Sequence, residues 1–442
     1  MIKNRTAILV LLTGLNLLNY IDRYIVSAVL VRMQAPVAEG GLALSNTQGG
    51  LLATAFLLGY FLTSPLFGAR ADKGARKGLI ALGVAVWSLA TVATGLAHSF
   101  ATLLAARIVV GVGEASYATL APTIIDDLTP ADRKNRALAI FYLAIPVGSA
   151  LGYLTGGFIQ AHWGWRYAFY ICGGPGLLLS LLCLAIAEPA RKLREAKARL
   201  LDGLRTMARI PLFRRAVLGY CAYTGAVSAF AYWAPKYIAH HYYMPQLSAE
   251  LAVKHADYYF GLITVVAGAL GTIIGGRWAD RALRGTPSEL AYDARDNRRA
   301  INTLLRICAL GMVFAAPMAA VCFAMPSPVL FFACAFLAEI ALFLSTSPVN
   351  AIGLRAVPPE LRASAMAGMI FAIHLFGDLW SPSLLGLLND VLISTVAMMS
   401  VPLVFAWSAY IWWPRRREAA GPAAGAPSGS GSLPAARVHT AT

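Results

Sequence analysis

Long apolar runs recur along almost the whole sequence, and they constrain the fold more than any other feature. Each run has about 20 residues, which as a helix is long enough to cross a hydrocarbon core of about 30 Å. Only 13% of the 442 residues are charged, whereas soluble domains carry about a quarter. The sequence therefore predicts an all-α membrane protein that crosses the bilayer many times.

We expect twelve transmembrane helices, with edges set by the apolar runs. They lie near residues 6–31, 47–69, 78–98, 100–127, 134–160, 166–187, 213–239, 258–280, 301–325, 328–350, 362–388 and 393–413. An even number of spans places both termini on one side of the membrane.

The basic residues indicate which side that is. The formal net charge of +16 would suggest a nucleic-acid partner in a soluble protein. Here the lysines and arginines gather in alternate short loops, the pattern of cytoplasmic loops. We expect cytoplasmic termini and no nucleic-acid partner, and the short loops favour a multi-pass protein of a bacterial inner (plasma) membrane.

The two halves of the sequence repeat each other. Gly68–Asp72 follows the second span, and a similar stretch, Gly276–Asp280, follows the eighth. Matching motifs at matching places indicate an internal repeat. We therefore predict a six-helix bundle over 1–187, a cytoplasmic linker over 188–212, a second six-helix bundle over 213–413 and a disordered cytoplasmic tail over 414–442. The linker suits either a helix lying on an anionic leaflet or a solvated connector.

Several charged residues lie inside the predicted spans. A charge at mid-bilayer costs at least about 3 kcal/mol, so it is seldom kept without a partner or a water-filled cavity. The residues in question are Asp22 and Arg23 in the first span, Arg107 and Glu114 in the fourth, Glu339 in the tenth, and His374 and Asp378 in the eleventh.

Helical spacing predicts how some of these groups are arranged. Arg107 and Glu114 are seven residues apart, about two turns, so they share one face of a helix. Asp22 and Arg23 are adjacent and diverge by roughly 100°, so neither neutralises the other. We expect a cluster in which Asp22 or Glu114 pairs with Arg107 or Arg23.

Two interpretations of this cluster remain open. Burial disfavours the charged form of a carboxyl group and a nearby arginine favours it, so opening the cavity to either side would couple protonation to conformation. On this interpretation the proton-coupling residues are Asp22, Glu114, His374 and Asp378, the last two of which share a face at i, i+4. Alternatively, the charges form permanent salt bridges that order the bundle.

The loop Gly68-Ala-Arg-Ala-Asp-Lys-Gly-Ala-Arg-Lys77 resembles the major facilitator signature G-x-x-x-D-x-x-x-R-K. In the second half only Gly276, Asp280 and Arg281 preserve it. The resemblance implies two six-helix bundles that rock about a central site and a cytoplasmic gate whose ion pairs break during the movement. The gate residues that we expect are Asp72, Arg76, Asp127, Arg133, Arg136, Asp280 and Arg362.

Three stretches resemble the spinster branch of that superfamily: Asn19–Arg23, Arg107–Ile125 and Phe141–Tyr153. The resemblance implies a lysophospholipid or a sphingosine-phosphate-like lipid as substrate, with its head group on arginine, since guanidinium matches phosphate as a bidentate fork. The substrate-binding residues that we expect are Asn19, Tyr20, Arg23, Arg107, Glu114, Tyr117, Phe141, Glu339 and Phe371.

The favoured function is secondary active transport of such an amphiphile by alternating access, coupled to protons. The alternative within transport is a proton-coupled symporter of a small organic anion, which shares the Asn19–Arg23 motif. A lipid-modifying membrane enzyme is disfavoured, since the sequence holds no Ser-His-Asp set, P-loop or metal-ligand spacing. We expect no cofactor and no metal, and a monomer whose partners are the bilayer, protons and a lipid-like small molecule.

Overall fold

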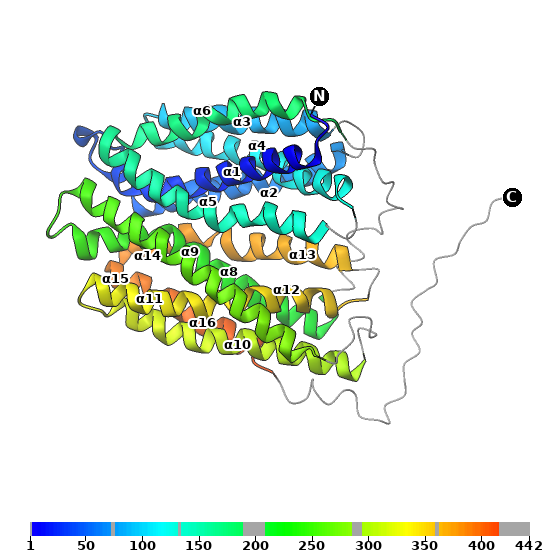
Figure 1. The fold of residues 1–442 in the computed structure, drawn as a ribbon. Coiled ribbons are helices and arrows are strands. Elements are labelled where there is room, and N and C mark those ends of the chain that lie inside the picture. Colours follow the sequence, from blue (N-terminus) through cyan, green and yellow to red (C-terminus); the bar gives the residue numbers. More distant parts are fainter. Residues whose placement is uncertain are drawn as a thin grey trace.

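The computed structural model describes residues 2–71, 76–130, 134–188, 208–284, 294–358 and 362–414, and these are helical almost throughout (Figure 1). The first half contains α1 (Arg5–Gln34), η1 (Val37–Glu39), α2 (Asn46–Ala71), α3 (Arg76–Gly95), α4 (Phe100–Leu128), α5 (Lys134–Trp163) and α6 (Trp165–Leu184). The second half contains α8 (Pro211–Ile238), η2 (Ala239–Tyr243), α9 (Ala249–Ala282), α10 (Arg295–Phe323), α11 (Pro328–Phe343), α12 (Thr346–Arg355), α13 (Arg362–Ile373), η4 (His374–Asp378), α14 (Ser381–Val391), α15 (Ser394–Met398) and α16 (Ser400–Trp412).

The helices form two groups, which Figure 1 shows one above the other. In the first group α1 packs on α5 and α6, α2 packs on α4, and α3 lies between α4 and α6. In the second group α10 packs on α11 and α16, and α16 packs on α8. The groups meet along α5 and α9, α2 and α14, and α1 and α8, which confirms the predicted all-α fold of two bundles.

Eleven stretches among the described residues are long and apolar enough to cross a membrane. Three of the predicted spans are interrupted: one is built from α11 and α12, one from α13, η4 and α14, and one from α15 and α16. The seventh predicted span corresponds to α8, which falls outside the eleven. Residues 216–233 of this helix hold no charged residue, so its lower hydropathy reflects the tyrosine, threonine, serine and glycine residues along it.

Glycines set the closest approaches within the first group. A Cβ added to Gly111 of α4 would lie 2.0 Å from the carbonyl oxygen of Phe56 on α2, so only glycine permits this contact. On α5, a Cβ added to Gly152 would lie 2.8 Å from the Cβ of Tyr24 on α1. These contacts fix α2 against α4 and α1 against α5.

The two ends of the bundle can be told apart by their contacts. Backbone bonds join Ile2 to the chain just after α6, so the N-terminus and the end of α6 share what we call the terminal end. The last turn of α8 contacts the last turn of α1 through Lys236 and Gln34, so both helices run from the terminal end to what we call the opposite end. The predicted limits of the bundles, linker and tail remain predictions, since 189–207 and 415–442 lie outside the described residues.

Candidate functional site

A cavity of about 250 Å³ lies between the two groups, with walls from α1, α2, α4, α8, η4 and α14. Much of its lining is apolar or aromatic, and the charged side chains are Arg23 and Arg107 on the first-half wall and Asp378 on the second-half wall. The lining residues are Tyr20, Arg23, Tyr24, Val26, Ser27, Ala53, Phe56, Leu57, Arg107, Tyr223, Thr224, Val227, Ser228, Ala231, Tyr232, Asp378 and Pro382.

Asp22 and Arg23 diverge, as their adjacency on a helix predicts. Asp22 turns away from the cavity toward α3, where its Oδ2 accepts hydrogen bonds from Trp87 Nε1 at 3.1 Å and from Thr91 Oγ1 at 3.3 Å. Arg23 turns toward α4, where its Nε donates to Glu114 Oε2 at 2.8 Å. Of the pairings left open by the sequence, the structure contains Arg23 with Glu114.

Aromatic rings surround the Arg23 guanidinium as well. Its central carbon lies 4.9 Å from the ring centroid of Tyr20, 5.0 Å from that of Phe56 and 5.1 Å from that of Tyr60. Ring faces attract a cation, most strongly when it is desolvated. Arg23 is therefore held by an ion pair and by three rings.

Arg107 is in a different situation. It is 2% exposed, and its guanidinium stacks 4.9 Å from the centroid of the Phe56 ring. Gly111, one turn further along α4, allows the close approach of α2 that places Phe56 there. Among the described residues, Arg107 Nε and Nη1 have no hydrogen-bond partner. A buried cation with two unused donors beside a cavity is suited to an anionic group of a ligand.

The second-half wall carries the pair predicted at i, i+4. His374 Nδ1 lies 2.9 Å from Asp378 Oδ2, within the π-helical turn η4, a geometry frequent at functional sites. The His374 ring lies 6.3 Å from the ring of Tyr60 in the first half. This pair therefore lies where the two groups meet.

The remaining expected ligand contacts are spread over three places. Asn19, Tyr117 and Phe141 are buried inside the first group, and the Tyr117 hydroxyl donates to the carbonyl of Leu12, so none of these three lines the cavity. Phe371 of α13 packs against Phe61 of α2, with ring centroids 4.5 Å apart.

Glu339 lies inside the second group rather than at the cavity. It is 4% exposed, and its Oε1 accepts a hydrogen bond from Thr264 Oγ1 at 3.0 Å.

Some of the expected gate residues form a cluster at the terminal end, within the first group. Arg76 Nη1 lies 2.6 Å from Asp127 Oδ2, and Arg76 Nε lies 3.3 Å from Glu188 Oε1. Asp280 is exposed near the end of α9. Asp72 and Arg133 lie outside the described residues, as do the side chains of Arg136 and Arg362.

The opposite end holds a connection between the groups that sequence reasoning missed. Asp390 of α14 accepts hydrogen bonds from the backbone N–H of Asn46 at 2.9 Å, and from the backbone N–H and hydroxyl of Thr47 at 2.7 and 2.6 Å. These N–H groups begin α2 and have no partner within the helix. Ser45 and Gln48 supply a capping box for the same helix end.

Lys236 of α8 adds to this connection by donating to Gln34 Oε1 and Asn46 Oδ1. We call the contacts of Asp390 and Lys236 with α1 and α2 the opposite-end latch. The sequence contained a signal for the α2 side of the latch, since Ser-x-x-Gln marks the start of that helix. Nothing in the sequence identified Asp390 of α14 as the residue that contacts it.

A buried carboxyl group at the interface was also missed. Asp257 of α9 is fully buried, and neither of its oxygens has a hydrogen-bond partner among the described residues. A Cβ added to Gly157 of α5 would lie 2.8 Å from Asp257 Oδ2. The carboxyl group of Asp257 is therefore buried at the interface between the two halves.

Two helical bundles with a charged cavity between them are the arrangement of secondary transporters. The sequence model of the Major Facilitator Superfamily matches residues 12–382. Human "Protein spinster homolog 1" is 35% identical over 407 residues, covering 87% of this chain and 73% of the relative. The Arabidopsis thaliana "Probable sphingolipid transporter spinster homolog 1" is 30% identical over 422 residues, covering 85% and 81%.

Solved structures agree in fold. A bacterial homolog of the human lysosomal transporter spinster, in an inward-facing and unoccupied conformation, superposes with a TM-score of 0.78 at 22% identity, covering 95% of this chain and 98% of that one. A D-xylose–proton symporter gives a TM-score of 0.74 at 18% identity, covering 94% and 99%. The chain therefore belongs to the spinster branch of the major facilitator superfamily, and it is a transporter, not an enzyme.

Proposed function

We propose that this chain moves a lysophospholipid or a sphingosine-phosphate-like amphiphile across the membrane by alternating access, coupled to protons. The observation that carries the proposal is Arg107, a buried guanidinium with unused donors beside a largely apolar cavity. An anionic head group would take the unused donors, and an alkyl chain would lie along residues such as Val26, Leu57 and Val227. The name of the Arabidopsis relative supports a sphingolipid-like substrate.

Proton coupling rests on Asp22, Arg23 and Glu114 in the first half, together with His374 and Asp378 in the second. Glu114 Oε2 holds Arg23, whereas Oε1 has no hydrogen-bond partner among the described residues. Protonation of Glu114 would weaken its hold on Arg23, and the freed guanidinium could turn to a bound anion. Arg23 would then respond both to protonation of Glu114 and to binding of the substrate.

The direction of opening follows from the latch. Because the opposite-end latch joins the two groups, that end is closed in this structure. The loops at the terminal end carry most of the lysines and arginines, so we propose that this end faces the cytoplasm of a bacterial inner membrane. We further propose that the chain works as a monomer.

The test is uptake of a labelled lysophospholipid into proteoliposomes, with and without an imposed pH gradient. We expect uptake that the gradient stimulates, and a Glu114→Gln variant that still binds the lipid but has lost the stimulation. Uptake of a soluble carboxylate in place of the lysolipid would instead support the organic-anion symporter. Absence of lipid movement by the folded wild-type protein would contradict the proposal.

A further inference from the structure

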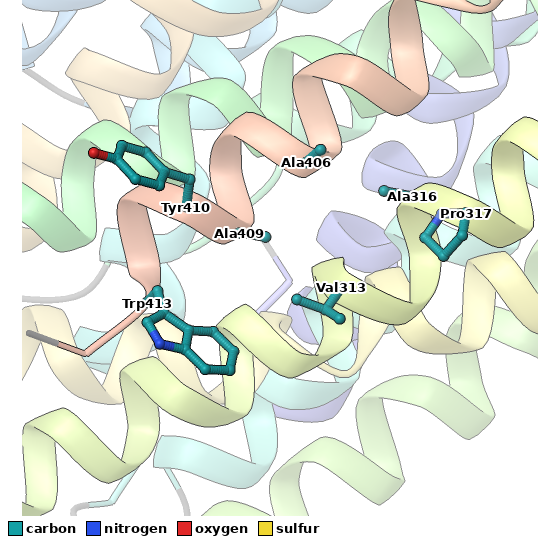
Figure 2. Close-up of a pocket in the computed structure, with 7 residues that line it drawn as sticks. All are labelled: Val313, Ala316, Pro317, Ala406, Ala409, Tyr410 and Trp413. Atoms are coloured by element: carbon teal, nitrogen blue, oxygen red, sulfur yellow. The ribbon is translucent and has the colours of Figure 1, made fainter.

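A groove of about 440 Å³ lies on the outer surface of the second group, between α10 and α16 (Figure 2). It is separate from the central cavity and shares no lining residue with it. Its lining residues are Val313, Ala316, Pro317, Ala406, Ala409, Tyr410 and Trp413. Tyr410 is 62% exposed, so the groove opens toward the surroundings of the protein.

Small side chains create this groove and aromatic ones bound it. Ala316, Ala406 and Ala409 leave space where two helices would normally fill their contact with larger residues. Trp413 lies at one end of the groove in Figure 2, and Ala316 and Pro317 lie at the other. Trp side chains prefer the boundary between hydrocarbon and water, so the groove runs from that boundary into the bilayer.

A cation lies on the face of α10 that lines the groove. Arg306 precedes Val313 by seven residues, about two turns, and so lies on the same face of α10. It is exposed, and no ion pair joins it to any residue within the described ranges. From Arg306 to Pro317 the helix rises about 16 Å, which matches half of a hydrocarbon core of about 30 Å. The distance from Arg306 to the far end of the groove thus matches the depth of the hydrocarbon region of one leaflet.

We propose that this groove binds one acyl chain of an anionic phospholipid from the leaflet at the terminal end, with the lipid phosphate on Arg306. A guanidinium holds phosphate in a bidentate fork. Toward the start of α10, Arg299 pairs with Asp296 at 3.6 Å, and Arg295 extends the positive charge along the same leaflet surface. The apolar lining would hold the acyl chain of the lipid, and the positive charge of Arg306 would favour an anionic head group. This site is independent of the transport function proposed above.

The test is native mass spectrometry of the full chain in mild detergent, titrated with phosphatidylglycerol or phosphatidylcholine of identical acyl chains. We expect phosphatidylglycerol to bind about fivefold more tightly, since one basic residue near an anionic group contributes about 1 kcal/mol. Arg306→Gln should remove this preference. Arg277→Gln, an exposed arginine near the same end of α9, should retain it.

A second pair of variants tests the groove itself. Ala406→Phe should fill the groove and weaken the binding of both lipids, whereas Leu403→Phe, at an exposed position of α16 outside the lining, should not. The proposal is overturned if the wild-type chain binds both lipids equally, if Arg306→Gln behaves like Arg277→Gln, or if Ala406→Phe binds lipid as the wild type does.

Discussion

Arg23, Arg107 and Glu114 form what we call the cavity cluster. This cluster and the opposite-end latch are both polar, and they differ in how completely their hydrogen-bonding groups are used. In the latch, both oxygens of Asp390 accept hydrogen bonds and Lys236 donates to two acceptors. In the cavity cluster, Arg107 Nε and Nη1 and Glu114 Oε1 have no partner among the described residues. Buried polar groups without a hydrogen-bond partner are costly. The latch, whose groups are paired, therefore stabilises the closed opposite end, whereas the unpaired groups of the cavity cluster would gain from a bound ligand.

The largest expected effect comes from breaking the one complete pair within the cavity cluster. Glu114→Ala leaves the Arg23 guanidinium partly buried without its anion, and loss of one partner of a buried pair costs about 3 kcal/mol. Equilibrium unfolding in mixed micelles should show this loss. Glu114→Gln should lose less, because the amide oxygen can still accept from Arg23. Wild-type stability in Glu114→Ala would mean that the ion pair contributes little.

A smaller effect is expected at the latch. Asp390→Asn exchanges a carboxylate for an amide at the start of α2, where loss of a capping interaction costs about 1 kcal/mol. This should shift the balance between closed and open opposite ends about fivefold. Spin labels at Val37 and Ile393, both exposed at this end, should report a longer mean distance in the variant, and an unchanged distance distribution would remove Asp390 from the latch.

The smallest effect is expected for the exposed connection between the halves. Arg32 Nη2 lies 3.2 Å from Glu250 Oε1, with side chains 21% and 48% exposed. Solvated pairs of this kind contribute about 0.5 kcal/mol or less. Arg32→Gln should therefore leave the same spin-label distance close to the wild-type value, and it serves as the control for Asp390→Asn.

The sequence predicted the fold because its signals are local and repeated. Apolar runs locate the helices, and the paired motifs after the second and eighth spans indicate two bundles. Helical geometry also predicted that Asp22 and Arg23 diverge, and that His374 lies beside Asp378. Each of these inferences needs only residues on one helix.

The features that the sequence did not predict depend on how helices distant in the sequence are aligned. Glu114 pairs with Arg23 and not with Arg107, a choice between two arginines that sequence spacing left open. The Tyr117 side chain points into the first bundle, where its hydroxyl donates to the Leu12 carbonyl. Asp390 caps a helix that begins 344 residues earlier, and no local pattern connects the two.

The most direct test of the central claim is equilibrium binding of a fluorescent lysophospholipid to Arg107→Gln, compared with wild type and with Asp390→Asn. If the unused donors of Arg107 hold the head group, Arg107→Gln should bind at least about tenfold more weakly, the value of a hydrogen bond to a charged group, with no loss of unfolding stability. Asp390→Asn should bind within about the fivefold set by its shift in conformation. Wild-type affinity in Arg107→Gln would contradict the assignment of the cavity cluster as the binding site.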